Sequence, residues 1–276
     1  MQRILRAFKS SKSSTPTSSY HAAEMSATLK GKIAVITGSS RSIGAAIAKH
    51  FGEQGAKVVV NYVNDAQAAD GVVSSIKAAG GSAVAVKADA STIAGGQHLL
   101  DEAVKAFGGI DIIVLNAGIM GSKLLADIDE AFFDAHFSTN VKGPLFLAKA
   151  AAPLLPAPGG RIIFFSTSLT VATGVAPNTL VYTATKGAVE QLARILAKDP
   201  SLGAKGITVN TVSPGPVDTP LFREGKPQGV IDAIAKAAPS GRLGEVGDIA
   251  PVVGFLASPA AQWVNGQNVR VNGGFA

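Results

Sequence analysis

The chain has 276 residues, of which 47% are hydrophobic and 16% are charged, so it holds enough apolar material for one large core and is not a disordered protein. It contains no cysteine, which excludes disulfides and thiolate catalysis, and its histidines lack metal-ligating spacing, so we predict no metal site. Residues 1–24 hold four basic side chains and one acidic one, about half of the net charge of +6, so the body is too weakly basic for a nucleic-acid partner.

Residues 1–27 are predicted to form an N-terminal extension, ahead of a single domain that spans residues 28–276. The first 23 residues include six serines and no acid, and the opening MQRILRAFK separates apolar from basic side chains on a helix. This composition is typical of mitochondrial transit peptides. The alternative is a flexible tail, or an upstream start with Met25 as the initiator; we favour this alternative and expect a cytoplasmic protein. No apolar run reaches the ~18 residues of a membrane span, so we predict no membrane partner.

Strand-like apolar runs alternate with helical patterns along the rest of the chain. The expected strands are residues 33–37, 57–62, 82–87, 111–115, 161–166, 207–212 and 268–271. The expected helices are residues 43–54, 66–78, 93–107, 130–137, 141–155, 182–198 and 248–256. Alternation of this kind predicts an α/β, doubly wound, Rossmann-type parallel sheet of about seven strands with helices on both faces. Ligands of such sheets bind at the carboxyl ends of the strands, where the strand order reverses.

A glycine-rich loop, TGSSRSIG, joins the first strand to the first helix over residues 37–44. Glycine permits the sharp turn and lets a pyrophosphate approach the helix N-terminus. Here the chain resembles the short-chain dehydrogenase/reductase family, whose fingerprint is T-G-x-x-x-G-x-G, although Ser42 replaces the middle glycine. The resemblance implies cofactor contacts from Gly38, Ser40, Arg41, Ile43 and Gly44.

The position that selects the cofactor follows the second strand. An acid there would bind the ribose 2′-hydroxyl of NAD, but this chain has Asn61. Asn61 does not repel a 2′-phosphate, and the guanidinium of Arg41 is suited to binding one, so we predict NADP(H). The resemblance implies further cofactor contacts from Asp89, Asn116, Gly118, Tyr182, Lys186, Pro214, Gly215, Val217 and Thr219.

Tyr182 and Lys186 form a Tyr-x-x-x-Lys pair at the head of an expected helix, where this spacing places both side chains on one face. A tyrosine with a pKa near 10 is a poor base at neutral pH, and a nearby ammonium is expected to lower that pKa. Tyr182 would then exchange a proton with a carbonyl oxygen. Ser168, preferred to its competitor Ser166, would polarise that oxygen. The resemblance implies that Asn140 completes the catalytic set with a water.

We therefore expect an NADPH-dependent oxidoreductase that reduces a ketone or aldehyde, similar to naphthol reductases, 3-oxoacyl-carrier-protein reductases and carbonyl reductases. An NAD-dependent alcohol or sugar dehydrogenase working oxidatively is the alternative, and a non-catalytic cofactor-sensing protein is a further one. The small-molecule substrate would lie against residues 119–127, 169–180 and 221–238. Helices 141–155 and 182–198 carry small or apolar residues on more than one face, which predicts a homo-oligomer, most simply a homotetramer.

Overall fold

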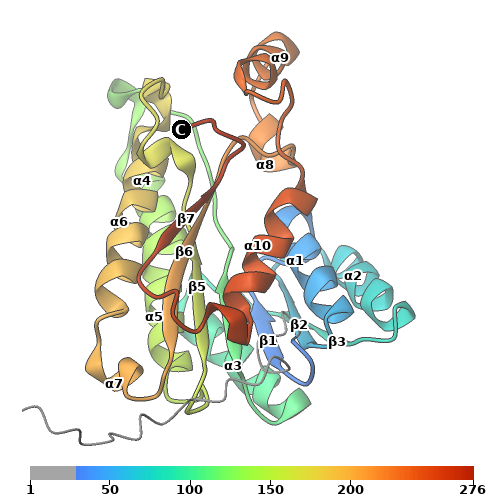
Figure 1. Ribbon diagram of the computed structural model, residues 1–276. Coiled ribbons are helices and arrows are strands. Elements are labelled where there is room, and N and C mark those ends of the chain that lie inside the picture. Colours follow the sequence, from blue (N-terminus) through green and yellow to red (C-terminus); the bar gives the residue numbers. More distant parts are fainter. Residues whose placement is uncertain (1–28) are drawn as a thin grey trace, which may run out of the picture.

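The computed structural model describes residues 29–276, so the predicted N-terminal extension lies outside the described residues. The described chain forms one parallel seven-stranded sheet in the order β3-β2-β1-β4-β5-β6-β7 (Figure 1). The strands are β1 (Ile33–Ile36), β2 (Lys57–Tyr62), β3 (Ser82–Lys87), β4 (Ile112–Leu115), β5 (Arg161–Phe165), β6 (Thr208–Pro214) and β7 (Asn268–Val271). All seven expected strands are confirmed, with shifts of one or two residues at some ends. The strand order reverses between β1 and β4.

Helices cover both faces of the sheet because the central strands are apolar on both sides. Along β2, Val58 and Val60 belong to one hydrophobic cluster and Val59 to the other, as the pleat requires. The first cluster includes side chains of α1 (Ser42–Glu53), α2 (Ala66–Ala78) and α10 (Val246–Ala257). The second includes side chains of α3 (Ile93–Phe107), α5 (Gly143–Ala151) and α6 (Leu180–Leu196). Figure 1 shows these two groups on opposite sides of the sheet.

The expected helices 130–137 and 141–155 are one continuous rod rather than two separate helices. α4 (Glu130–Phe137) runs through a π-helical turn, Ser138–Lys142, directly into α5. α5 ends at Ala151 instead of residue 155, since Pro153 and Pro156 cannot continue a helix. The π turn widens the rod at Asn140, and turns of this kind are frequent at functional sites.

The segment from residue 214 to 242, in which the sequence predicts neither a helix nor a strand, contains two helices. α8 (Pro220–Arg223) starts at a proline and is capped by the Thr219 hydroxyl, which accepts a hydrogen bond from the Phe222 amide at 3.2 Å. α9 (Gln228–Ala237) presents an apolar side with the buried Ile231. We call residues 219–243 the lid. A further short helix, α7 (Pro200–Gly203), follows α6.

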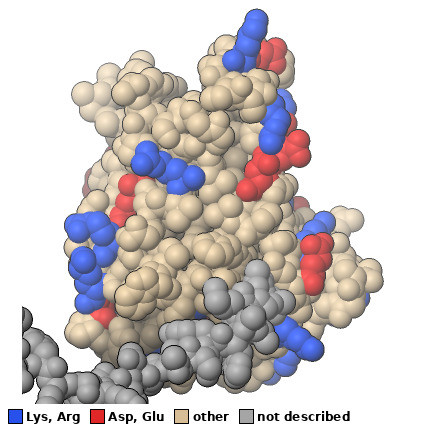
Figure 2. Space-filling model, viewed as in Figure 1, with Lys and Arg blue, Asp and Glu red and all other residues tan. Residues whose placement is uncertain are grey.

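The remaining regular segments are short 3-10 turns: Leu125–Asp127, Ser168–Thr170, Pro177–Thr179 and Pro259–Ala261. Between residues 29 and 276, no helix combines the length and the apolar character that crossing a bilayer requires. Uncharged side chains cover most of the face seen in Figure 2.

Gly143 generates a prediction about stability. A Cβ added there would lie 2.4 Å from the carbonyl oxygen of Ala90, because α5 begins directly against the loop after β3. We expect Gly143→Ala to lower the free energy of unfolding by about 1–3 kcal/mol through this overpacking. In the matched control, Gly71→Ala on the open side of α2, no atom lies near the new methyl group, so unfolding should become harder by up to about 1 kcal/mol. Thermal denaturation of both variants measures this, and equal melting temperatures would contradict it.

Candidate active site

A cavity of about 650 Å³ opens at the carboxyl edge of the sheet, next to the point where the strand order reverses. It brings together many of the predicted site residues, which come from five separate segments. Those that line it are Ile43, Asn116, Gly118, Ser168, Tyr182, Lys186, Pro214, Gly215, Val217 and Thr219. The predicted residues outside its lining are Gly38, Ser40, Arg41, Gly44, Asn61, Asp89 and Asn140.

Hydrogen bonds join the glycine-rich loop to the loop after β4. The Asn116 amide donates to the carbonyls of Thr37 at 2.9 Å and Gly38 at 3.1 Å. The Thr37 hydroxyl accepts a bond from the Ala117 amide at 2.9 Å. A Cβ on Gly44 would lie 2.3 Å from the Gly38 carbonyl oxygen, so only glycine fits there. The two strand ends therefore form one continuous edge of the site.

Ser42 adopts a φ of +52°, the left-handed region that favours glycine. The serine thus reproduces the backbone of the family's middle glycine, at a conformational cost of roughly 1 kcal/mol. Arg41 precedes it as the exposed N-cap residue of α1, and no side chain caps that helix. The first amides of α1 are therefore not occupied by a capping side chain, and they suit a phosphate group.

Asn61 is placed differently from the prediction. Its side chain is 1% exposed and already bonded: Oδ1 accepts from the Gly38 amide at 3.1 Å, and Nδ2 donates to the Ala88 carbonyl at 2.9 Å. Asn61 therefore shapes the glycine-rich loop from behind instead of presenting its side chain to a ribose. Asp89 is exposed at the end of β3, where its carboxylate accepts bonds from the amide and hydroxyl of Ser91.

Tyr182, Lys186 and Ser168 converge on the cavity, and each is nearly buried. The Lys186 ammonium lies 5.8 Å from the centroid of the Tyr182 ring and donates to the carbonyl of Phe165 at 2.9 Å. The Ser168 hydroxyl donates to the carbonyl of Ser213 at 3.2 Å. These bonds attach the helix and the serine loop to the ends of β5 and β6.

Burial dominates the protonation of this pair. It raises the pKa of Tyr182 to about 12, an effect that the Thr167 hydroxyl offsets only in part. It lowers the pKa of Lys186 to about 8. The expected lowering of the pKa of Tyr182 by the Lys186 ammonium is not observed in this structure, where burial raises that pKa and the Thr167 hydroxyl is the group that opposes the rise.

Asn140 lies in the π turn and is 1% exposed. Its side chain both accepts from the Ile119 amide and donates to the Ile119 carbonyl, each at 2.9 Å. A Cβ on Gly118 would lie 3.2 Å from Asn140 Oδ1 and 3.4 Å from Lys186 Nζ. Asn140 therefore lies beside Lys186, one layer behind the cavity wall.

The sequence predicted that the substrate lies against residues 221–238, and this segment does line the cavity through Leu221, Phe222, Lys226, Val230, Ala233, Ile234 and Ala237. Sequence reasoning missed that this segment contains a helix, α9, and it missed Phe275 as a lining residue. The apolar spacing of Val230 and Ile234 was a usable signal for α9. Phe275 offers no local signal, since it reaches the cavity only because β7 returns the chain to this edge.

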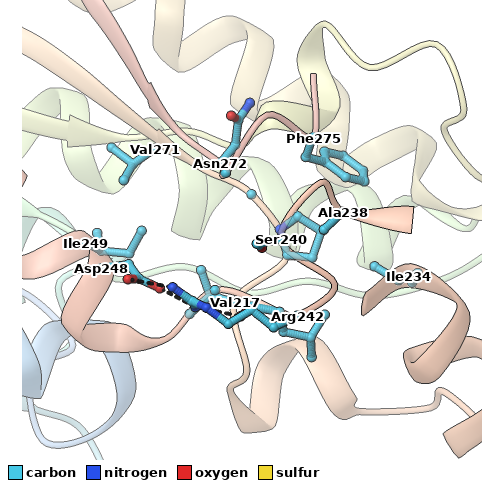
Figure 3. A pocket seen from close by; sticks show the side chains of 15 residues that line it. Val217, Ile234, Ala238, Ser240, Arg242, Asp248, Ile249, Val271, Asn272 and Phe275 are labelled. Atoms are coloured by element: carbon cyan, nitrogen blue, oxygen red, sulfur yellow. Dashed lines mark hydrogen bonds and ion pairs between the residues drawn. The ribbon is translucent and has the colours of Figure 1, made fainter. Parts of the chain in front are cut away.

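A second hollow of about 220 Å³ lies behind the lid (Figure 3). Ile234 and Phe275 line both hollows and so lie between them. At its far side, Arg242 forms an ion pair with Asp248 at 2.7 Å, drawn as dashed lines in Figure 3. This pair and a bond from the Glu245 amide lower the pKa of Asp248 to about 2. The ion pair attaches the end of the lid to α10.

Comparison with known proteins covers most of the chain. Residues 38–276 match the family described as enoyl-(acyl carrier protein) reductase. A probable tetrahydroxynaphthalene reductase of Zymoseptoria tritici is 42% identical over 256 residues, covering 89% of this chain and 94% of that protein. A versicolorin reductase of Emericella nidulans is 42% identical over 257 residues, with 89% and 96% covered.

Solved structures agree with these relatives. A dehydrogenase/reductase of Sinorhizobium meliloti superposes with a TM-score of 0.85 at 39% identity, covering 91% of this chain and 98% of that one. A short chain dehydrogenase of Burkholderia cenocepacia in complex with NADP has a TM-score of 0.83 at 36% identity, with 90% and 98% covered. The likeness therefore extends over the sheet, the cavity and the lid.

The burial of Lys186 generates a prediction about pH. Between pH 8 and 10.5 the unfolded chain binds a proton that the folded chain has released, so this lysine makes stability rise with pH in that window. We expect the stability of the wild type relative to Lys186→Met to increase from pH 8 to 10, by at most roughly 1 kcal/mol per pH unit. Chemical denaturation across that range measures it. The exposed Lys77→Met is the control, and a Lys186→Met curve parallel to the wild type would contradict the prediction.

Proposed function

The chain belongs to the short-chain dehydrogenase/reductase family, and we propose that it reduces a ketone or aldehyde to an alcohol with NADPH. It is an oxidoreductase acting on carbonyl or CH–OH groups, as its named relatives are. One observation carries the proposal: Tyr182, Lys186 and Ser168 meet in a largely apolar cavity that the glycine-rich loop also enters through Ile43. A proton donor and a dinucleotide loop thus border the same space.

The residues around the loop fit a nicotinamide dinucleotide. Gly44 and Gly38 leave no room for a Cβ between them and their neighbours, and the start of α1 is uncapped. Ser40, Arg41 and Ile43 would hold the phosphates. Asn116, Gly118, Pro214, Gly215, Val217 and Thr219 would hold the nicotinamide end with Tyr182 and Lys186, and Asp89 would border the adenine. When bound, the cofactor supplies the hydride.

NADPH is favoured over NADH by the charges beside the loop. Arg41 is exposed, and the first acid after β2, Asp65, turns its carboxylate to the Ala68 amide of its own helix at 2.9 Å. Asn61 carries no charge and is bonded to the loop. Arg41 would therefore be the cation next to a 2′-phosphate. The similar structure from Burkholderia cenocepacia is a complex with NADP.

Tyr182 is the proposed proton donor. With its pKa raised to about 12, the phenol keeps its proton at neutral pH and can release it to the substrate oxygen as negative charge develops there. The Ser168 hydroxyl would hydrogen-bond that oxygen and polarise the carbonyl. Lys186 stays oriented by the Phe165 carbonyl and supplies positive charge below the ring. Asn140 fixes the loop at Ile119 beside the lysine and would hold the water of a proton relay.

The lid defines the proposed substrate class. Its walls are apolar, with Leu221, Phe222, Val230 and Ile234 facing the space together with Phe275. Such walls bind a hydrophobic or aromatic ketone in preference to a sugar or a phosphate ester. The relatives named for tetrahydroxynaphthalene and versicolorin support that preference.

We also propose a homotetramer built on α5 and α6. Ile195 is 54% exposed, and Leu180 is 49% exposed at the start of the same helix. Apolar side chains at this exposure favour a second buried contact. For location we propose the cytoplasm, with a mitochondrion as the alternative that residues 1–27 leave open.

The proton donor generates the first functional prediction. We expect Tyr182→Phe to lower kcat for ketone reduction by at least about 100-fold, because Tyr182 carries the only phenol oxygen among the described residues that line the cavity, and general acid catalysis is typically worth 10²–10⁴-fold. Nicotinamide fluorescence should show that NADPH still binds. Thr183→Val, one residue along α6 and outside the cavity lining, is the control. A Tyr182→Phe enzyme that keeps more than a tenth of its kcat would rule out this role.

The preference for NADPH over NADH generates the second functional prediction. We expect Arg41→Ala to raise the Kd for NADPH by about 10- to 100-fold and to leave that for NADH nearly unchanged, since a charged hydrogen bond contributes about 1.5–3 kcal/mol. Titration with each cofactor measures this, and Lys49→Ala on the exposed side of α1 is the control. Asn61 is left intact, because an aspartate there would face the Ala88 carbonyl. Equal Kd values for NADPH and NADH in the wild type would overturn the choice.

A further inference from the structure

Glu190 lies on α6 four residues after Lys186 and eight after Tyr182, so the three side chains share one side of the helix. Its side chain is partly buried, and it does not line the cavity. The sequence gives it no role, since an acid on a helix is most often a solvated charge.

The carboxylate of Glu190 accepts two short hydrogen bonds at a single oxygen. The hydroxyls of Ser166 and Thr170 each donate to Oε1 at 2.7 Å. These two donors lie two residues before and two residues after Ser168. Bonds to an ionised acceptor are roughly twice as strong as neutral ones. Glu190 therefore binds both ends of the five-residue segment 166–170, which contains Ser168.

No cation competes for this carboxylate. Among residues 29–276, no lysine, arginine or histidine lies within ion-pair distance of Glu190. The Ser166 hydroxyl also lies 3.2 Å from the Lys186 carbonyl, but it has one proton, and the shorter distance of 2.7 Å favours donation to Glu190. The segment is thus fixed to α6 at two points and to β6 through the bond from Ser168 to Ser213.

We propose that Glu190 is a positioning residue that sets where the Ser168 hydroxyl lies relative to Tyr182. The inference rests on the proposed reductase function. Ser168 and Tyr182 come from different elements, and both must reach one substrate oxygen. A displacement of about 1 Å can cost 10²-fold in rate, so a rigid link between the two elements has a direct catalytic consequence. Glu190 is that link, and it acts through Ser168 without touching the substrate.

The test is a double-mutant cycle between Glu190 and Ser168. We expect Glu190→Ala to lower kcat by about 10- to 100-fold while the Kd for NADPH, read by nicotinamide fluorescence, changes less than about twofold. In a Ser168→Ala background, Glu190→Ala should cause little further loss, because the residue it positions is already gone. Glu190→Gln keeps one acceptor oxygen and should recover most of the activity. Gln191→Ala, the exposed neighbour on α6, is the matched control.

A second readout needs no cofactor. Glu190→Ala and Thr170→Val should shift the melting temperature of the unloaded protein non-additively, because each removes the same bond. If Glu190→Ala does not fold, Thr170→Val, which removes one of the two bonds to Glu190, takes its place in the cycle with Ser168→Ala.

Two outcomes would overturn the inference, and they are distinguishable. If Ser168→Ala lowers kcat and the Glu190 substitution multiplies that loss in full, Glu190 acts on general stability and the positioning role is wrong, while the proposed function stands. If Ser168→Ala alone leaves kcat unchanged, the serine role in the proposed function is wrong, and the role of Glu190 falls with it.

Discussion

The side-chain amide of Asn116 holds together two loops that the topology sends to opposite faces of the sheet. It donates to the carbonyls of Thr37 and Gly38, and the Thr37 hydroxyl accepts the neighbouring Ala117 amide. An amide suits this position because it supplies two donors to carbonyls that have left the sheet ladder. Without these bonds, the glycine-rich loop and the wall at Gly118 would have no fixed spacing. The cavity, the fit to a dinucleotide and the approach of Lys186 all depend on that spacing.

Burial at this edge is consistent with Tyr182 as the proton donor of the proposed reduction. A tyrosine that abstracts a proton needs a low pKa, whereas a tyrosine that donates one needs to keep it until charge develops on the substrate. Burial raises the pKa of Tyr182 and lowers that of Lys186, so the structure disfavours a phenolate beside the lysine. The Ser168 hydroxyl donates to the Ser213 carbonyl, and the Phe165 carbonyl accepts from Lys186. Neither Ser168 nor Phe165 adds a charge to the site. The arrangement is suited to stabilising negative charge that develops on the substrate oxygen, and it is not suited to forming a phenolate at Tyr182.

Local patterns were sufficient for the fold and for part of the site. The central strands are short apolar runs buried on both faces, and such runs are visible in the sequence. Tyr182 and Lys186 follow from helical spacing together with the other motifs of the resemblance, because Tyr-x-x-x-Lys by itself is a common pattern. Asn61 was misjudged because its position after β2 was visible but the carbonyl of Ala88, a strand away, was not. The π turn at Asn140 was not predicted, because helical spacing in the sequence does not distinguish a π turn from an α-helical one. Glu190 depends on a contact across twenty residues of chain.

The lid is the region whose secondary structure the sequence did not predict. Val230 and Ile234 have the apolar spacing of a helix, but Pro227 and the polar residues around α9 are typical of a loop, so the helix was not predicted. Behind that helix lies a hollow of about 220 Å³ instead of a packed core, and the far end of the lid is attached through the exposed Arg242–Asp248 pair. Close packing makes core substitutions costly, whereas side chains facing a hollow have room to change. Ile234 and Phe275 line this smaller hollow on one side and the larger cavity, proposed to bind the substrate, on the other. Substrate preference can therefore vary at these positions while the sheet and the residues around Tyr182 stay unchanged.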